Sequence, residues 1–261
     1  MLPMGWETSV EKRWNPIKTR NVQRFGMILQ QAQWQRLRFS PTEHNEYLKL
    51  ELPGVWEPPC SHCSLSFGEG KSSQILFLME TKQTVDEMRR IQANLQYQSM
   101  LTIPCIWRAG VLAWIRKQEV DLHVQTYSFN HIDAHVMTNP NSPWRIIGFY
   151  GRPEEHRKHE SWGYLRNLHC RSSLPWLHIG DYNEILTSAE KQGRIPKPNR
   201  LMEKSRTALL HCGLVDLSFY GNIFTWRNGC SGEAFFQGRL DIACAIIEWK
   251  ALFPHNKVTH L

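Results

Sequence analysis

The chain has 261 residues, 41% of them hydrophobic, which is enough to form one large domain with a substantial core. Its longest apolar runs are only strand-sized, and its first residues lack the charged and apolar regions of a signal peptide, so the sequence predicts neither a membrane span nor secretion. The seven Cys have no regular spacing, which indicates reduced thiols and a nuclear or cytoplasmic location.

The formal net charge of +7 is unevenly distributed along the chain. Residues 1–40 contain seven basic and two acidic residues, so they supply +5 of this charge. We therefore expect a basic extension over residues 1–45, partly disordered or helical, followed by a domain over residues 46–261. Such an arm could attract nucleic-acid phosphates. The simpler interpretation is a solvated tail or a non-native upstream reading frame, and we favour it.

The first half of the domain predicts several strands and one helix. An apolar run over residues 74–79 indicates a strand that ends at Glu80. Thr84 and Glu87 have the spacing of a capping box at the start of a helix. The spacing predicts a hairpin pairing residues 111–116 with residues 120–124. His131, Asp133 and His135 alternate with apolar residues, which predicts a strand with one solvent-facing side.

The second half predicts two further helices between strands. Residues 144–151 are apolar on both faces, as in a core strand that ends near Tyr150. Helical spacing covers residues 157–170 and 200–212, and Gly213 is placed to end the second helix. The Gly- and Pro-containing residues 191–200 indicate a basic surface loop.

The segment Leu174–Glu184 is the most informative for chemistry. An apolar strand is broken at Gly180 and is followed at once by Asp181 and Asn183. Side chains two positions apart on an extended segment point the same way, roughly 7 Å apart. A carboxylate there could orient a water molecule while the amide binds a phosphoryl oxygen. The alternative is an ordinary turn, since Gly, Asp and Asn are also turn formers.

Four hydrophobic segments thus end in, or near, a polar group that could bind metal or phosphate. These groups are Glu80, Tyr150, Asp181 and Asp241, and we expect them to meet at one end of a sheet sandwich. Tyr150 could instead be a core aromatic, and Asp241 could pair with Arg239.

With these motifs in place, the chain resembles the endonuclease/exonuclease/phosphatase superfamily, and most of all the apurinic-type endonuclease domain of plant LINE-type (non-LTR) retrotransposon polyproteins. The matching stretches keep the family's order over about residues 74–261. They are Phe77–Lys82, Trp144–Gly151, Pro175–Glu184, Glu190–Lys191, Phe224–Trp226 and Arg239–Asp241. The resemblance implies an α/β fold, a four-layer sandwich of two mainly antiparallel or mixed β-sheets flanked by helices, incomplete at both ends.

The resemblance also implies roles for single residues. Glu80 would hold a divalent metal, Mg²⁺ or in its place Mn²⁺, and Tyr150 would contact the scissile phosphate. Asp181 would position or deprotonate the attacking water, and Asn183 would stabilise charge developing on phosphorus. Asp241 would support the far side of the site.

A nucleic-acid surface is implied beside this site. Thr225 and Trp226 would lie on it together with Arg227, although Trp226 could also be an ordinary core aromatic. DNA is the partner of the ancestral element, and no membrane is implied.

The sequence departs from the family pattern in two places. By alignment on Gly54 and Pro58, Glu51 stands where the family has a metal- and phosphate-binding Asn. The family's late Ser-Asp-His motif is missing, because no Asp follows Asp241, so we expect the domain to lack its last strand and this motif. His255 and His260 have no Asp neighbour and are not assigned a role.

The predicted function is that of a retrotransposon-derived endonuclease-like domain that ancestrally hydrolysed DNA with Mg²⁺ and is weak or inactive in this copy. The alternatives are a non-catalytic nucleic-acid-binding relic and a small-molecule or lipid phosphatase of the same superfamily. Cys60 and Cys63 have the spacing of a zinc knuckle but lack a second pair, so zinc is the less favoured metal.

Overall fold

The structure is a computed structural model that describes residues 35–41, 48–52, 74–79, 84–104, 111–228 and 230–260. All of them belong to the compact unit Ala32–Leu261. No helix among these residues is both long and apolar enough to cross a membrane. The predicted N-terminal helix and Cys60 and Cys63 lie outside the described residues.

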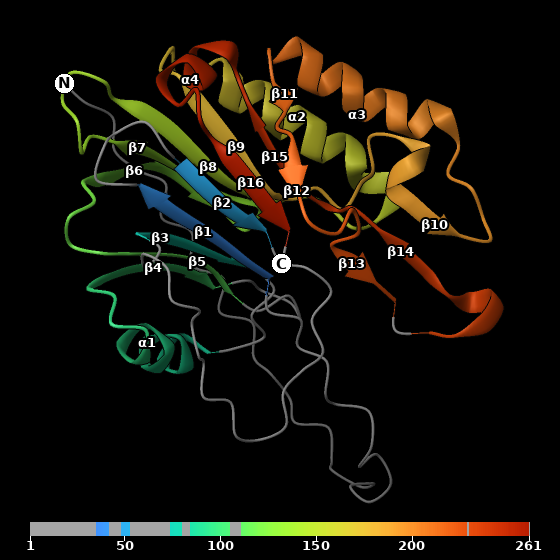
Figure 1. The fold of residues 1–261 in the computed structure, drawn as a ribbon, viewed down its shortest axis with the longest axis horizontal. Helices are drawn as coiled ribbons and strands as arrows, with labels where there is room; N and C mark the ends of the chain where they lie inside the picture. Colours follow the sequence, from blue (N-terminus) through green and yellow to red (C-terminus); the bar gives the residue numbers. More distant parts are fainter. Residues whose placement is uncertain are drawn as a thin grey trace, which may run out of the picture. The chain divides into compact units, whose positions relative to one another are not determined.

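Two large β-sheets form the centre of the domain (Figure 1). The first sheet contains, in spatial order, β12 (Phe219–Tyr220), β16 (Lys257–His260), β2 (Leu48–Leu52), β1 (Gln35–Pro41), β3 (Ile75–Met79), β5 (Val111–Arg116) and β4 (Ser99–Pro104). The second contains β11 (Val215–Asp216), β15 (Asp241–Ala245), β9 (Trp176–Asp181), β8 (Trp144–Tyr150), β7 (His131–Val136) and β6 (Leu122–Ser128). Both sheets mix parallel and antiparallel pairs.

A small third sheet and the helices complete the domain. The third sheet contains β10 (Lys191–Gly193), β14 (Phe236–Gly238) and β13 (Trp226–Arg227). The α-helices are α1 (Val85–Asn94), α2 (Lys158–His169), α3 (Asn199–His211) and α4 (Ile247–Leu252). Short 3₁₀ turns cover Glu155–Arg157, Ser188–Glu190 and Gly232–Ala234.

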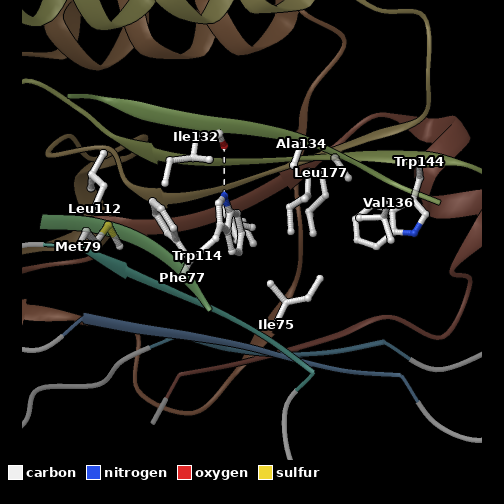
Figure 2. Close-up of a cluster of buried hydrophobic side chains, with 14 of the residues drawn as sticks. Ile75, Phe77, Met79, Leu112, Trp114, Ile132, Ala134, Val136, Trp144 and Leu177 are labelled. Atoms are coloured by element: carbon white, nitrogen blue, oxygen red, sulfur yellow. Dashed lines mark hydrogen bonds between the residues drawn. The ribbon is translucent and has the colours of Figure 1, made fainter. Parts of the chain in front are cut away.

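Three apolar clusters separate the layers. The central one lies between the two large sheets, where Phe77 of β3 and Trp114 of β5 face Ile132 of β7 and Leu177 of β9 (Figure 2). The Trp114 Nε1–H donates to the Ile132 carbonyl at 3.4 Å and so joins the two sheets. A second cluster packs α2 and α3 on the outer face of the second sheet, and a third packs α1 on the outer face of the first. The predicted four-layer α/β sandwich is therefore confirmed.

The predicted helices agree with the structure. Thr84 caps α1 by a reciprocal capping box with Glu87, and α2 and α3 begin and end within one residue of the predicted bounds. Gly213 follows α3 with φ of 64°, the left-handed conformation expected at a helix C-terminus.

The predicted hairpin over residues 111–124 is wrong. β5 pairs with β3 and β4 in the first sheet, whereas β6 pairs with β7 in the second. Val120, between the two strands, is buried in the central cluster. The chain therefore crosses from one sheet to the other here, which local alternation of apolar residues cannot reveal.

The predicted solvent-facing side of β7 is also wrong. His131 and Asp133 are buried, and Asp133 accepts two hydrogen bonds from the guanidinium of Arg145 at 2.7 and 2.9 Å. Burial lowers the pKa of His131 to about 4. Polar residues alternate along this strand because Asp133 forms a buried ion pair with Arg145, while His131 hydrogen-bonds to the hydroxyls of Thr126 and Ser128.

Residues 35–41, which we assigned to the N-terminal extension, form part of the first sheet. β1 is hydrogen-bonded between β2 and β3 and is antiparallel to both. The compact unit begins at Ala32, so the basic extension is shorter than the predicted residues 1–45.

Candidate active site

Three strand ends meet at one edge of the second sheet. Tyr150 is the last residue of β8, Asp181 the last of β9, and Asp241 the first of β15. In the strand register Asp181 is paired with Tyr150 on one side and with Asp241 on the other. Paired residues in neighbouring strands lie about 5 Å apart, so the structure brings together three of the predicted site residues.

The end of β3 lies against the same place from the first sheet. Met79 is the last described residue of β3, and its Sδ accepts a hydrogen bond from the Asp181 backbone N–H at 3.4 Å. Glu80 itself lies outside the described residues.

The residues after β9 form a turn rather than the predicted extended segment. Asn183 has φ of 52°, a left-handed conformation that Asn tolerates better than most residues. Its backbone N–H donates to Asp181 Oδ1 at 2.6 Å, and its Nδ2 donates to the Gly151 carbonyl at 3.0 Å. The turn, rather than strand alternation, holds the carboxylate and the amide together.

Two glycines allow β8 and β9 to approach this closely. Gly180 has φ of 141°, and a Cβ there would lie 1.9 Å from the Phe149 carbonyl oxygen. A Cβ on Gly151 would lie 2.4 Å from the Tyr182 carbonyl oxygen. No other residue fits either position without moving the backbone that carries Asp181.

Sequence reasoning missed a buried charge cluster that holds this turn. Lys158, the first residue of α2, donates to the Asn183 carbonyl and lies 3.7 Å from Glu184 Oε2. Lys197, just before α3, lies 2.6 Å from Glu184 Oε1 and 3.1 Å from Glu155 Oε2. Burial lowers the pKa of Lys158, while the Glu184 carboxylate opposes that shift. The signals in the sequence were Glu184, one residue beyond Asn183, and the predicted basic loop over residues 191–200, which contains Lys197.

The other side of the site is anchored by Thr225. Its hydroxyl accepts hydrogen bonds from the backbone N–H groups of Leu240 at 3.0 Å and Asp241 at 3.1 Å. Thr225 is only 5% exposed, so it lies below the surface and not on the nucleic-acid surface as predicted. Its bonds to the chain at the start of β15 leave little of the side chain for solvent.

The neighbouring Trp226 and Arg227 form β13 and are half-buried. The Trp226 ring lies 5.0 Å from the Phe236 ring across the hairpin to β14, and the Lys191 ammonium lies 5.5 Å from the centre of that Phe236 ring. An aromatic pair with a nearby cation is suited to contact a base or sugar and its phosphate.

Arg239, the alternative partner considered for Asp241, instead binds Asp216 and Glu190. It donates to both Asp216 oxygens at 2.6 Å and to Glu190 Oε1 at 2.8 Å. Although burial opposes its charge, these carboxylates raise the pKa of Arg239. Glu190 also accepts from the backbone N–H groups of residues 186 and 187, so this matched motif residue supports the loop between β9 and β10.

His260, the last His of the chain, is held by contacts with neighbouring residues of the domain. His260 stacks on Phe219 with ring centres 4.1 Å apart, and its Nδ1 is 2.6 Å from the Asn222 carbonyl. Burial lowers its pKa to about 4.

Glu51, the counterpart of the early family Asn, lies in β2. The register pairs it with Arg38 of β1, and Arg38 pairs in turn with Leu76 of β3. β2 and β3 run in the same direction, so Glu51 is level with a residue four positions before Glu80. That Glu51 replaces the metal- and phosphate-binding Asn of the family pattern remains a prediction.

The donor set suits a hard divalent cation. Asp181 and Asp241 are 2% and 0% exposed and are neighbours in the strand register, and carboxylate oxygens are the ligands that hard divalent cations prefer. The described residues contain no group of three or more His, Cys, Asp and Glu side chains that could hold a metal.

Comparison with known proteins gave solved structures only, since no family model and no curated protein matched. The endonuclease domain of TRAS1, a telomere-specific non-LTR retrotransposon, is 12% identical, with 59% of this chain and 70% of that chain covered and a TM-score of 0.47. The Xenopus laevis APE2 catalytic domain is 13% identical, with 67% and 74% covered and a TM-score of 0.44. The human Nocturnin catalytic domain is 14% identical, with 67% and 69% covered and a TM-score of 0.43.

Proposed function

We propose that this chain is a retrotransposon-type endonuclease-like domain whose site is built to hydrolyse DNA phosphodiester bonds. The observation that carries the proposal is the strand register that pairs Asp181 with Tyr150 and with Asp241 at one sheet edge. The motifs that suggested this function are far apart in sequence, and their meeting in space supports it.

Each residue would contribute a simple step. The Asp181 carboxylate accepts a proton from the attacking water and orients it toward phosphorus. Asn183 uses one amide hydrogen for the Gly151 carbonyl, which leaves the second for a phosphoryl oxygen. The Tyr150 hydroxyl would contact the same phosphate, and Asp241 would support the site from β15.

Glu80, together with Asp181 or Asp241, would hold Mg²⁺, with Mn²⁺ as a substitute. When bound, the cation supplies electrostatic stabilisation of the leaving oxygen. The reaction also requires a proton donor for the leaving oxygen, and the resemblance assigns this role to a late Asp-His pair. A chain without that pair should turn over weakly, and so should one in which Glu51 takes the place of the early Asn.

Plasmid nicking tests this proposal. Loss of one positioned acid or base costs about 10²- to 10⁴-fold, so the chain should nick supercoiled plasmid with Mg²⁺ slowly or not measurably. Any nicking should disappear in Asp181→Asn, whereas His156→Gln on the surface should behave like the parent. Efficient nicking that survives Asp181→Asn would overturn the assignment of the site.

DNA binding separates the proposal from its alternatives. A nucleic-acid-binding relic would bind DNA with steep salt dependence and without turnover. A small-molecule or lipid phosphatase would release phosphate from a soluble ester or headgroup and bind no DNA at low salt. We favour nucleic acid because the Trp226–Phe236 pair lies on the hairpin that follows Thr225, and Thr225 is bonded to Asp241. Lys191 of the neighbouring strand β10 adds a cation over the Phe236 ring.

A further inference from the structure

A groove of about 500 Å³ lies between α2 and α3. His159, Trp162 and Arg166 line it from α2, and Arg200, Glu203 and Lys204 line it from α3. Residues three and four apart share one face of a helix, so these side chains form two facing rows. Figure 1 shows the two helices side by side on the same face of the second sheet.

The groove is basic, and its cations are not neutralised by neighbours. Within the described part of the chain, Arg166, Arg200 and Lys204 form no ion pair, and Glu203 is the only acid that lines the groove. Cations just outside it behave differently. Arg157, for example, is 2.7 Å from Glu160, and Lys197 is 2.6 Å from Glu184.

The groove begins beside the candidate active site. His159 follows Lys158, which donates to the Asn183 carbonyl, and Arg200 lies three residues after Lys197, which binds Glu184. The Asp181–Glu184 turn is therefore attached to the first turn of α2 and to the residues before α3. A ligand held at the turn and extended past it would meet the groove cations next.

We infer that the groove binds the phosphate backbone of the nucleic acid on the flank of the site, an inference that rests on the proposed function. Arg166 and Arg200 carry planar guanidinium groups that bind phosphate oxygens in pairs, and Lys204 adds a point charge. Trp162, which is 4% exposed, forms the floor and is too buried to stack on a base. The chemistry therefore fits sequence-independent phosphate contacts, which position DNA without selecting its sequence.

The test uses the full chain, a fluorescent 20-base-pair duplex and a charge-matched control. Arg200→Gln with Lys204→Gln removes two exposed cations from α3, and Arg90→Gln with Lys250→Gln removes two exposed cations from α1 and α4. Each lost phosphate contact lowers the slope of log K against log salt by about 0.9. The groove variant should therefore lose up to about 2 in slope and bind about 10- to 30-fold more weakly at 0.15 M salt. The control should keep the slope and affinity of the parent.

The outcomes distinguish this inference from the proposed function. If the parent binds the duplex and both variants show the same slope, the groove assignment fails while the proposed function stands. If the parent binds no DNA at low salt, both fail. If polyglutamate binds the parent as tightly as the duplex does, and only the groove variant loses it, the partner is an acidic protein and the nucleic-acid assignment is overturned.

Discussion

The candidate site and the hairpin beside it differ in how firmly the fold holds them. Asp181 and Asp241 are 2% and 0% exposed and are fixed by the register of β9 and β15, whereas Phe236, the first residue of the central strand of the third sheet, is 39% exposed. A buried polar group keeps its place only where backbone and neighbours satisfy it, so any movement there is costly. Exposed side chains on the hairpin can change with little cost to the fold.

This difference separates two kinds of requirement. In the proposed function, the chemistry would depend on atoms held by the core, while contact with a long substrate would depend on residues that the core restrains less. Substitutions at the strand ends should therefore change stability, and substitutions on the hairpin should change binding alone.

The largest expected effect is on stability at Gly180. Gly180→Ala places a Cβ 1.9 Å from the Phe149 carbonyl oxygen in a left-handed backbone, so unfolding free energy should fall by roughly 3 kcal/mol or more. Gly163→Ala on α2 is the matched control, because a Cβ there meets nothing within 4 Å and should stabilise by about 0.5–1 kcal/mol. Urea unfolding measures both. Equal effects at the two glycines would show that the strand end is not tightly held.

The next effect, which is smaller for each pH unit, concerns the pH dependence of stability and the core behind the site. His178 of β9 is fully buried, its Nδ1 is hydrogen-bonded to the Tyr182 hydroxyl, and burial lowers its pKa to about 3. Between pH 6.5 and 3 the unfolded chain binds a proton that the folded chain does not. Within this window, His178 should therefore lower the free energy of unfolding by about 1.4 kcal/mol for each unit by which the pH falls.

Urea unfolding at several pH values tests this. His178→Gln should reduce the pH slope by the contribution of one proton, and the remaining slope should come from other buried histidines such as His131. His156→Gln, on the exposed surface, should leave the slope unchanged. An unchanged slope in His178→Gln would show that the group titrates normally in the folded chain.

The smallest effect should be on binding at the hairpin. Trp226→Ala should weaken DNA binding by about 1 kcal/mol, or roughly fivefold, because one stacking surface is lost. Tyr220→Ala removes a 62% exposed aromatic on β12 and should bind DNA like the parent. Fluorescence anisotropy with a labelled duplex reports both affinities. An equal loss of DNA affinity in the two variants would contradict DNA binding by the hairpin that carries Trp226.

Much of the fold could be predicted because short sequence patterns specify its helices, strands and turns. The capping box at Thr84, the apolar run before Asp181 and the glycine after α3 each reflect a backbone preference that acts over a few residues. The order of the motifs also predicted which strand ends carry polar groups.

What the sequence alone determined was the kind of elements and the chemistry at their ends, because spacing and side-chain type act locally. Tertiary structure decided the rest. It put β5 and β6 in different sheets, buried Thr225 under the start of β15, and used Lys158 to hold the turn at Asn183. These outcomes depend on contacts between residues far apart in the chain, and such contacts leave no periodic signal in the sequence.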